Sequence, residues 1–486
     1  MEEIKSPVYH RYKSRIKRKA SRKLAPVLVP LSEAYNLGRA AINHLYWRWR
    51  RSSGRIPFDM AAPFALEPAS TAGLPKKNVI WVMLDALRQD IFEEFLRRGG
   101  LSDYFDRGAY FPRAFSQGSW TYPSIFSFLT GVFPFNSGTT KLVREDENLY
   151  SLCDDFDGNC PTVFSILRDN GYKVGSILDG WGLTVRKTAG QAHREDRYFE
   201  ENWGWFYGQG RRFLTLDELS SVSRDYILES AAQGPFMLFV RSMYTHSPYR
   251  GLFNSAKYVN GLSRRRWAFR LMDGFIRGLQ HFEAAYFKPL LAALREAGQL
   301  DNTLIIICSD HGDMFWNVED DLRSEVVNDE VWRHQLEPYN ALIKVPLFIW
   351  GGQMKGVYPD RFRLVDVLPT LIEELGIDYD TSSFDGISVR RTAPRPLYAD
   401  SAGYGHSAVS FQDTGAKLLI SKRLGKVAYK ITEDEYEQLD LRIEADNRLE
   451  KLEEFLEQVN RYPLIETAPE SDDALTRRLR ALGYID

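Results

Sequence analysis

A series of short, continuous apolar runs that alternate with helical patterns constrains the fold of this chain most strongly. The run from Asn78 to Leu84 contains β-branched residues and has no polar face, as in a strand that is buried on both sides of a sheet. The same strand pattern recurs at 172–178, 236–244, 303–309 and 346–350. Helical patterns begin near 89 and cover 215–232, 264–297 and 365–375. Strands that alternate with helices predict an α/β domain with a largely parallel sheet between helical layers.

Both ends of the chain differ from this alternating part. Short strand patterns at 417–421, 427–431 and 437–441 precede a charged helical stretch at 445–459, which predicts a small α+β subdomain. A linker rich in Pro, Ala and Gly at 68–77 separates the first residues from the rest. We therefore expect three parts: an N-terminal extension with its linker at 1–76, the main α/β domain at 77–395 and a C-terminal subdomain at 396–486 that completes the fold.

Charge and composition bound the partners and the location. With 486 residues and a formal net charge of -2, the whole chain is not expected to bind nucleic acid specifically. Residues 10–55 are basic and aromatic, which suits peripheral contact with a membrane or an acidic partner. A solvated extension with a helix packed on the main domain is the alternative. The three cysteines, and the lack of a secretory or bilayer-spanning apolar run, favour a cytoplasmic location, with membrane association left open.

Polar residues follow several of the predicted strands. Asp85 closes the first strand, Asp310 and His311 close the strand at 303–309, and His246 lies just past the strand at 236–244. Ligands of open α/β sheets bind beyond the carboxyl ends of the strands. Two carboxylates and an imidazole there could converge on one divalent metal, with Mn²⁺, Zn²⁺ or Mg²⁺ the suitable ions. Each residue also has a structural alternative: a helix N-cap for the aspartate, a packed histidine, or turn chemistry at 310–313.

Thr121 is the candidate for a nucleophile. Pro123 and Ser124 can open a helix, with Thr121 just before it. A hydroxyl there lies in the positive field of the helix N-terminus, which also favours an anionic substrate. A metal beside it would lower its pKa and give an alkoxide. A plain threonine N-cap is the alternative.

Taken together, these segments resemble the alkaline phosphatase/sulfatase superfamily, specifically its sulfatase-like branch. The resemblance runs from about residue 78 to the C-terminus, with its elements in family order. The matching segments are 78–88, 121–131, 246–249, 300–312, 334–347, 366–371 and 479–484. The resemblance implies an alkaline-phosphatase-like α/β fold with a small C-terminal α+β subdomain, and it makes 77–395 a sulfatase-like catalytic domain.

This chain departs from the usual sulfatase pattern. Sulfatases of the usual kind carry Cys or Ser at the position of Thr121, which is oxidised to formylglycine, and they carry Arg where this chain has Ile125. The resemblance therefore implies direct attack by Thr121, as in the phosphodiesterase and phosphoglycerol-transferase branches. The usual second aspartate is Ala86, and His311 stands where many sulfatases have Asn. Fewer carboxylates and one imidazole favour Mn²⁺ or Zn²⁺, with Mg²⁺ or Ca²⁺ as alternatives.

The resemblance implies a metal-dependent hydrolase of phosphoric or sulfuric esters, acting on a small-molecule or polymer-linked substrate. The expected metal ligands are Asp85, Thr121, Asp310 and His311. His246 or His334 would protonate the leaving oxygen or clamp the transferred group. Arg88 and Lys141 are weaker candidates for substrate binding, with surface or structural roles as their alternative. A phosphotransferase to an alcohol acceptor, and a non-catalytic binding protein on the same scaffold, are the alternative functions.

Overall fold

The structure is a computed structural model, and its described residues all lie within 56–314 and 332–486. These are 64–66, 76–145, 148–154, 156–157, 160–179, 204–208, 214–246, 274–313, 337–391, 393–403, 406–413, 415–422, 424–431, 437–443 and 446–465. The predicted contact segment 10–55 and the candidate His334 lie outside the described residues.

The described residues form a nine-stranded mixed sheet. In spatial order its strands are β1 (Ala65–Leu66), β13 (Met354–Val357), β3 (Gly108–Tyr110), β12 (Leu347–Trp350), β10 (Thr303–Cys308), β2 (Asn78–Leu84), β9 (Phe236–Ser242), β7 (Lys173–Leu178) and β8 (Trp205–Gly208). Strands β10, β2, β9, β7 and β8 run parallel, and β12 lies antiparallel to β10 and β3. The parallel strands confirm the predicted α/β sheet, and β2 lies in its interior, between β10 and β9, with every residue of its apolar run buried.

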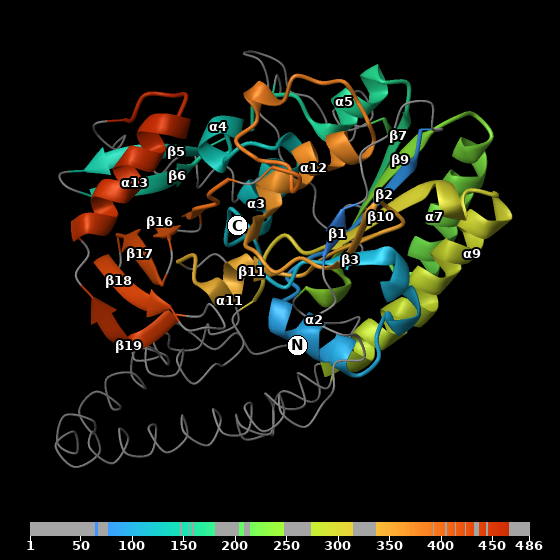
Figure 1. The fold of residues 1–486 in the computed structure, drawn as a ribbon, viewed down its shortest axis with the longest axis horizontal. Helices are drawn as coiled ribbons and strands as arrows, with labels where there is room; N and C mark the ends of the chain where they lie inside the picture. The colour runs from blue at the N-terminus through green and yellow to red at the C-terminus, as the bar shows by residue number, and fades with distance from the viewer. Residues whose placement is uncertain are drawn as a thin grey trace, which may run out of the picture. The chain divides into compact units, whose positions relative to one another are not determined.

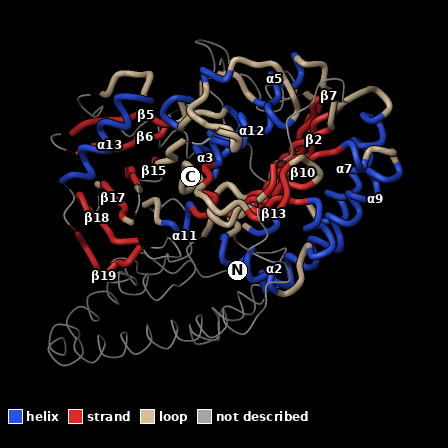
Figure 2. Tube along the Cα trace, viewed as in Figure 1, coloured by secondary structure: helices blue, strands red, loops and turns tan. Residues whose placement is uncertain are grey.

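Helices cover both faces of this sheet, as Figures 1 and 2 show. One layer consists of α3 (Thr121–Thr130), α5 (Val163–Asp169) and α12 (Val367–Glu374), and the other of α2 (Gln89–Arg97), α7 (Leu216–Ala231) and α9 (Lys288–Glu296). Alternate residues of β2 face the first layer, where the Trp81 ring stacks on Phe128 at a centroid distance of 5.1 Å. Residues 264–273 of the predicted helix lie outside the described part, and within 274–297 the helix is not uniform, because Glu283–Phe287 is π-helical before α9 begins.

The C-terminal part is a separate antiparallel sheet. Its strands are β15 (Leu397–Gly403), β16 (His406–Gln412), β17 (Ala416–Ser421), β18 (Gly425–Ile431) and β19 (Glu437–Ile443), and α13 (Asp446–Val459) follows them. The hairpin of β5 (Thr140–Glu145) and β6 (Asn148–Cys153) adds to the same core. This confirms the predicted α+β subdomain, with β15 and β16 in addition to the three expected strands.

Several shorter elements join these parts. They are α4 (Pro134–Ser137), α11 (Asn340–Ile343), and a small sheet of β11 (Lys344–Val345), β4 (Ala114–Phe115) and β14 (Phe362–Arg363). The backbone N–H of Ser119 donates to the carbonyl of Asp400, and the N–H of Asp400 donates to that of Gln117, each at 3.1 Å. Strand β15 therefore holds the segment that leads into α3. Across the described ranges, no helix combines the length and the apolar character needed to cross a membrane.

Candidate active site

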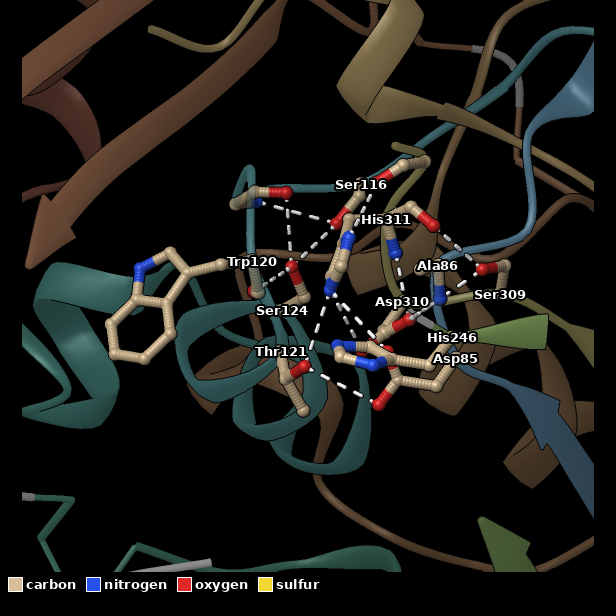
Figure 3. A network of polar contacts seen from close by, with 12 residues as sticks. Asp85, Ala86, Ser116, Trp120, Thr121, Ser124, His246, Ser309, Asp310 and His311 are labelled. Carbon is tan, nitrogen blue, oxygen red and sulfur yellow. Dashed lines mark hydrogen bonds and ion pairs between the residues drawn. The ribbon is translucent and has the colours of Figure 1, made fainter. Parts of the chain in front are cut away.

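Residues from three adjacent parallel strands and one helix converge at one edge of the main sheet. Asp85 directly follows β2, Asp310 and His311 follow β10, and His246 follows β9 through the short helical turn Met243–Thr245. Thr121 is the first residue of α3. Figure 3 shows the side chains of Asp85, Thr121, His246 and His311 pointing toward one another. The structure thus brings together five of the predicted site residues.

A trio of potential metal ligands forms the centre of this cluster. Ligand atoms of Asp85, Asp310 and His311 all lie within 4.8 Å of one another, and all three residues are fully buried. His311 Nε2 is 3.6 Å from Asp85 Oδ1 and 3.4 Å from Asp310 Oδ2. A divalent cation about 2.1 Å from each ligand separates its ligands by roughly 3.0 to 3.5 Å. The observed spacing therefore needs little adjustment to hold such an ion.

The electrostatics of the trio also fit a cation. Burial, and then the negative charge of Asp85, raises the pKa of Asp310 to about 7. Oδ2 of Asp310 is buried and accepts no hydrogen bond from the part of the chain that the structure describes. A buried carboxylate oxygen in this state costs free energy unless a positive charge compensates it. The site therefore fits a divalent ion, which would supply that charge.

The orientation of His311 prepares its other nitrogen for coordination. Nδ1 lies 2.6 Å from the carbonyl oxygen of Gly312, and because a carbonyl only accepts, Nδ1 carries the proton. Burial lowers the pKa of His311, although the Asp85 carboxylate opposes this shift. The neutral ring therefore presents the Nε2 lone pair to the carboxylates, the arrangement typical of metal-bound histidines.

The Thr121 hydroxyl faces the trio. Oγ1 lies 3.2 Å from His311 Nε2 and 3.4 Å from Asp85 Oδ2. Helix α3 has Trp120 as its N-cap, with extended backbone and no side-chain cap hydrogen bond. The N-cap alternative for Thr121 is therefore wrong, and the helix begins at Thr121, two residues before Pro123. Thr121 is partly exposed while the trio is buried, so a substrate can reach the hydroxyl.

A network of serine contacts fixes the segment before Thr121. The buried Ser124 hydroxyl lies 2.7 Å from the carbonyl oxygen of Trp120, 3.0 Å from that of Gly118 and 2.9 Å from Ser116 Oγ (Figure 3). Gly118 has no room for a side chain, because a Cβ there would lie 2.9 Å from Ser124 Oγ. These contacts hold the chain that enters α3, so the position of Thr121 does not depend on its own side chain.

Backbone strain accompanies the turn after Asp85. Ala86 has φ of 62°, a left-handed conformation that costs a non-glycine residue about 1 to 2 kcal/mol. Its N–H donates to Asp310 Oδ1 at 3.2 Å, and Thr245 Oγ1 donates to the Asp85 carbonyl at 2.6 Å. The strained turn thereby joins the ends of β2, β9 and β10.

The structural alternatives were a helix N-cap role for Asp85 and a turn role for Asp310, and only the second is observed. Helix α2 has Arg88 as its N-cap, so Asp85 does not cap it. Asp310 does take part in turn chemistry, since its Oδ1 accepts the N–H of His311 at 2.9 Å. The other oxygen of Asp310, Oδ2, lies 3.4 Å from His311 Nε2, and the turn and a ligand role are therefore compatible.

Arg241 is a site residue that the sequence patterns did not indicate as functional. Its Nε and Nη2 donate to Asp85 Oδ2 at 3.2 and 2.9 Å, and its side chain is 5% exposed. It lies on β9, in the apolar run Phe236–Ser242. The signal that could have indicated Arg241 is its charge within an apolar strand that is buried on both faces. A charged side chain is buried in such a strand only when it is paired.

The predicted proton donor His246 lies at the rim of the cluster. Its Nε2 is 3.9 Å from Asp85 Oδ1, and its side chain is 18% exposed. This places it between the buried ligands and the solvent. The other predicted histidine, His334, is outside the described residues, so its role stays a prediction.

The two predicted substrate-binding cations have carboxylate partners. Arg88 is buried and donates to both carboxylate oxygens of Asp90, at 3.0 and 2.9 Å, and to the carbonyl of Asp313. Lys141, which is half-exposed, forms an ion pair with Asp154 at 2.6 Å. These contacts are of the kind expected for the structural alternative, and substrate binding by either residue stays a prediction.

The chain is similar to known sulfatases and to a related hydrolase. The family model described as Sulfatase matches residues 77–377. An arylsulfatase of Clostridium perfringens is 25% identical over 65% of this chain and 78% of its own. A choline-sulfatase of Rhizobium meliloti is 22% identical over 68% and 75%. The solved structure of a phosphonate monoester hydrolase from Silicibacter pomeroyi, 16% identical, covers 79% of this chain and 95% of its own with a TM-score of 0.54. The predicted alkaline-phosphatase-like fold is confirmed.

Proposed function

Because this chain belongs to the sulfatase family, we propose that it is a metal-dependent hydrolase of phosphoric or sulfuric esters in which Thr121 is the nucleophile. The observation that carries the proposal is the position of the Thr121 hydroxyl, 3.2 Å from His311 Nε2 and 3.4 Å from Asp85 Oδ2. A partly exposed hydroxyl beside two buried carboxylates and an imidazole is the arrangement that activates a weak nucleophile.

Asp85, Asp310, His311 and Thr121 would hold one divalent cation. When bound, it would supply Lewis-acid chemistry, polarising the ester and lowering the pKa of the threonine hydroxyl. One nitrogen among oxygen ligands favours Mn²⁺ or Zn²⁺, with Mg²⁺ or Ca²⁺ as alternatives.

The residues of the chain then divide the reaction between them. The N-terminus of α3 carries partial positive charge and points at the anionic ester. This attraction binds and orients the ester. Thr121 Oγ1, which is partly exposed, releases its proton to solvent and bonds to phosphorus or sulfur as the bond to the leaving oxygen breaks. His246, at the rim, donates the proton that the leaving oxygen requires, a role that His334 shares as a candidate. Water then attacks phosphorus or sulfur and gives one proton back to His246, while the bond to Thr121 Oγ1 breaks and the acid leaves.

The choice between phosphate and sulfate rests on Thr121. A threonine cannot mature to formylglycine, so the hydroxyl itself must attack. The phosphonate monoester hydrolase likeness supports phosphorus esters, and the arylsulfatase and choline-sulfatase likenesses support small sulfate esters. We favour phosphate esters, including diesters, on a small or polymer-linked alcohol. The cytoplasmic location and the contact through residues 10–55 stay predictions.

A panel assay tests the proposal. Aryl phosphate monoesters, diesters, phosphonates and sulfates are offered to the full chain with Mn²⁺, Zn²⁺, Mg²⁺ or Ca²⁺. Thr121→Ala should abolish turnover, whereas Thr130→Ala, at the other end of the same helix, should retain it. Full activity in Thr121→Ala would refute the nucleophile. Product carried to an added alcohol instead of water would favour a phosphotransferase.

A further inference from the structure

We propose that Arg241 is a positioning residue that fixes the cation-facing oxygen of Asp85. This inference rests on the proposed metal-dependent function and deepens it. Arg241 places two donors, Nε at 3.2 Å and Nη2 at 2.9 Å, on one and the same oxygen, Oδ2. These two hydrogen bonds therefore fix the rotation of the Asp85 carboxylate about its Cβ–Cγ bond.

The other oxygen of Asp85 is directed at the two histidines. Oδ1 lies 3.6 Å from His311 Nε2 and 3.9 Å from His246 Nε2. A carboxylate that two donors hold by Oδ2 can offer Oδ1 without losing rotational freedom on binding. Arg241 thus fixes which oxygen does what: Oδ2 accepts from the guanidinium, and Oδ1 is left to bind the cation.

A second buried arginine pair in the same chain shows a different geometry. Arg363 reaches both oxygens of Asp366, with Nη2 at 2.7 Å from Oδ1 and Nε at 3.1 Å from Oδ2. That grip engages the whole carboxylate and suits a purely structural pair. The grip of Arg241 is one-sided, and the oxygen it serves, Oδ2, is also the one closest to the hydroxyl of Thr121.

The anchoring of Arg241 makes such a role feasible. The residue lies on β9, which is parallel to β2 and pairs residue 241 with Met83, two positions before Asp85. Its side chain is 5% exposed, and Nη2 also meets the sulfur of Met243 at 3.3 Å. A side chain held on a buried strand keeps its orientation whether or not a cation is bound.

Two physical effects of Arg241 predict opposite changes in metal affinity, and this makes the proposal testable. If the clamp orients Asp85, removing it should weaken binding about 10- to 100-fold, as loss of other supporting contacts to metal ligands does. If Arg241 acts only as a positive charge near the site, removing it should strengthen cation binding, because the carboxylates would no longer share their charge with it.

The experiment measures Mn²⁺ and Zn²⁺ binding to the metal-free full chain by titration calorimetry. Arg241→Met removes the donors and the charge, Arg241→Gln restores a neutral donor, and Arg241→Lys restores the charge with a single donor group. Arg390→Met is the matched control, since Arg390 also pairs with a buried carboxylate, that of Glu374. Glu374 contacts Gly352, which follows β12 at the end of the sheet away from the metal ligands.

The expected result is affinity lowered about 10- to 100-fold in Arg241→Met, less in Arg241→Gln and Arg241→Lys, and unchanged in Arg390→Met. Equal or tighter binding by a folded Arg241→Met would overturn the proposal. So would failure of all three Arg241 variants to fold while Arg390→Met folds, because Arg241 would then serve the fold alone. A wild-type chain that binds neither ion would instead refute the proposed function.

Discussion

Asp310→Asn should stabilise the metal-free protein above neutral pH while abolishing its stabilisation by metal. The substitution keeps the Oδ1 acceptor for the N–H groups of Ala86 and His311, and it removes the charge of a fully buried carboxylate. These two properties separate its effect on the fold from its effect on the cation.

The magnitude follows from the raised pKa of Asp310, about 7 against an ordinary 3.8. Between these values the folded state holds a proton that the unfolded state releases, so wild-type stability falls as pH rises from about 4 to about 7. The full shift is worth about 4 kcal/mol. The new amide group faces His311 Nε2 at the Oδ2 position, and if it makes no hydrogen bond it costs about 1 to 3 kcal/mol. The net gain at pH 8 is therefore about 1 to 3 kcal/mol.

Urea unfolding at pH 5 and pH 8, with a chelator present, measures this gain. The advantage of Asp310→Asn over wild type should grow between the two pH values. Added Mn²⁺ at 100 times its Kd should stabilise wild type by about 2.7 kcal/mol and leave the variant unchanged. A variant with the same pH dependence as wild type would refute the assigned burial cost, and metal stabilisation of the variant would refute Asp310 as a ligand.

Three further predictions concern Asp400, His246 and removal of the metal. Burial raises the pKa of Asp400 to about 7, so Asp400→Asn, which keeps an acceptor for Thr140, should also be more stable than wild type at pH 8 but not at pH 4; equal curves in urea would contradict this. His246→Gln should lower kcat about 10²- to 10⁴-fold for alkyl esters and much less for nitrophenyl esters, whose leaving oxygen needs no proton; equal losses would exclude it as the acid. Dialysis against a chelator should abolish turnover and lower the Tm, and Mn²⁺ or Zn²⁺ should restore both.

The strand ends were predictable from the sequence because burial on both faces leaves a plain apolar signature. The run Asn78–Leu84 is β2 without a change of boundary, and Asp85 then falls at the sheet edge where the rule for α/β sheets places ligands. Asp310 and His311 follow in the same way from β10. Only the chain order of apolar runs was needed to bring these residues together.

Other features depend on contacts that sequence patterns do not carry. Strand β15 contains two Ala, an Asp and a Gly, which are depleted in strands, and its pairing with β16 determines it. The left-handed backbone at Ala86 could not be predicted, because no glycine stands at that position. Arg241 was hidden because an isolated charge in an apolar run has meaning only once its partner, Asp85, is known to lie beside it.

Mass spectrometry of the protein trapped during turnover would detect the covalent intermediate on Thr121 itself. Full-length chain with Mn²⁺ and an aryl phosphate is quenched in acid within one turnover and digested. The expected result is a peptide that carries one phosphoryl group on Thr121, absent from the Thr121→Ala variant and lost on longer incubation. Rapid turnover with Thr121 unmodified at every time point, or a phosphoryl group on another residue, would contradict it.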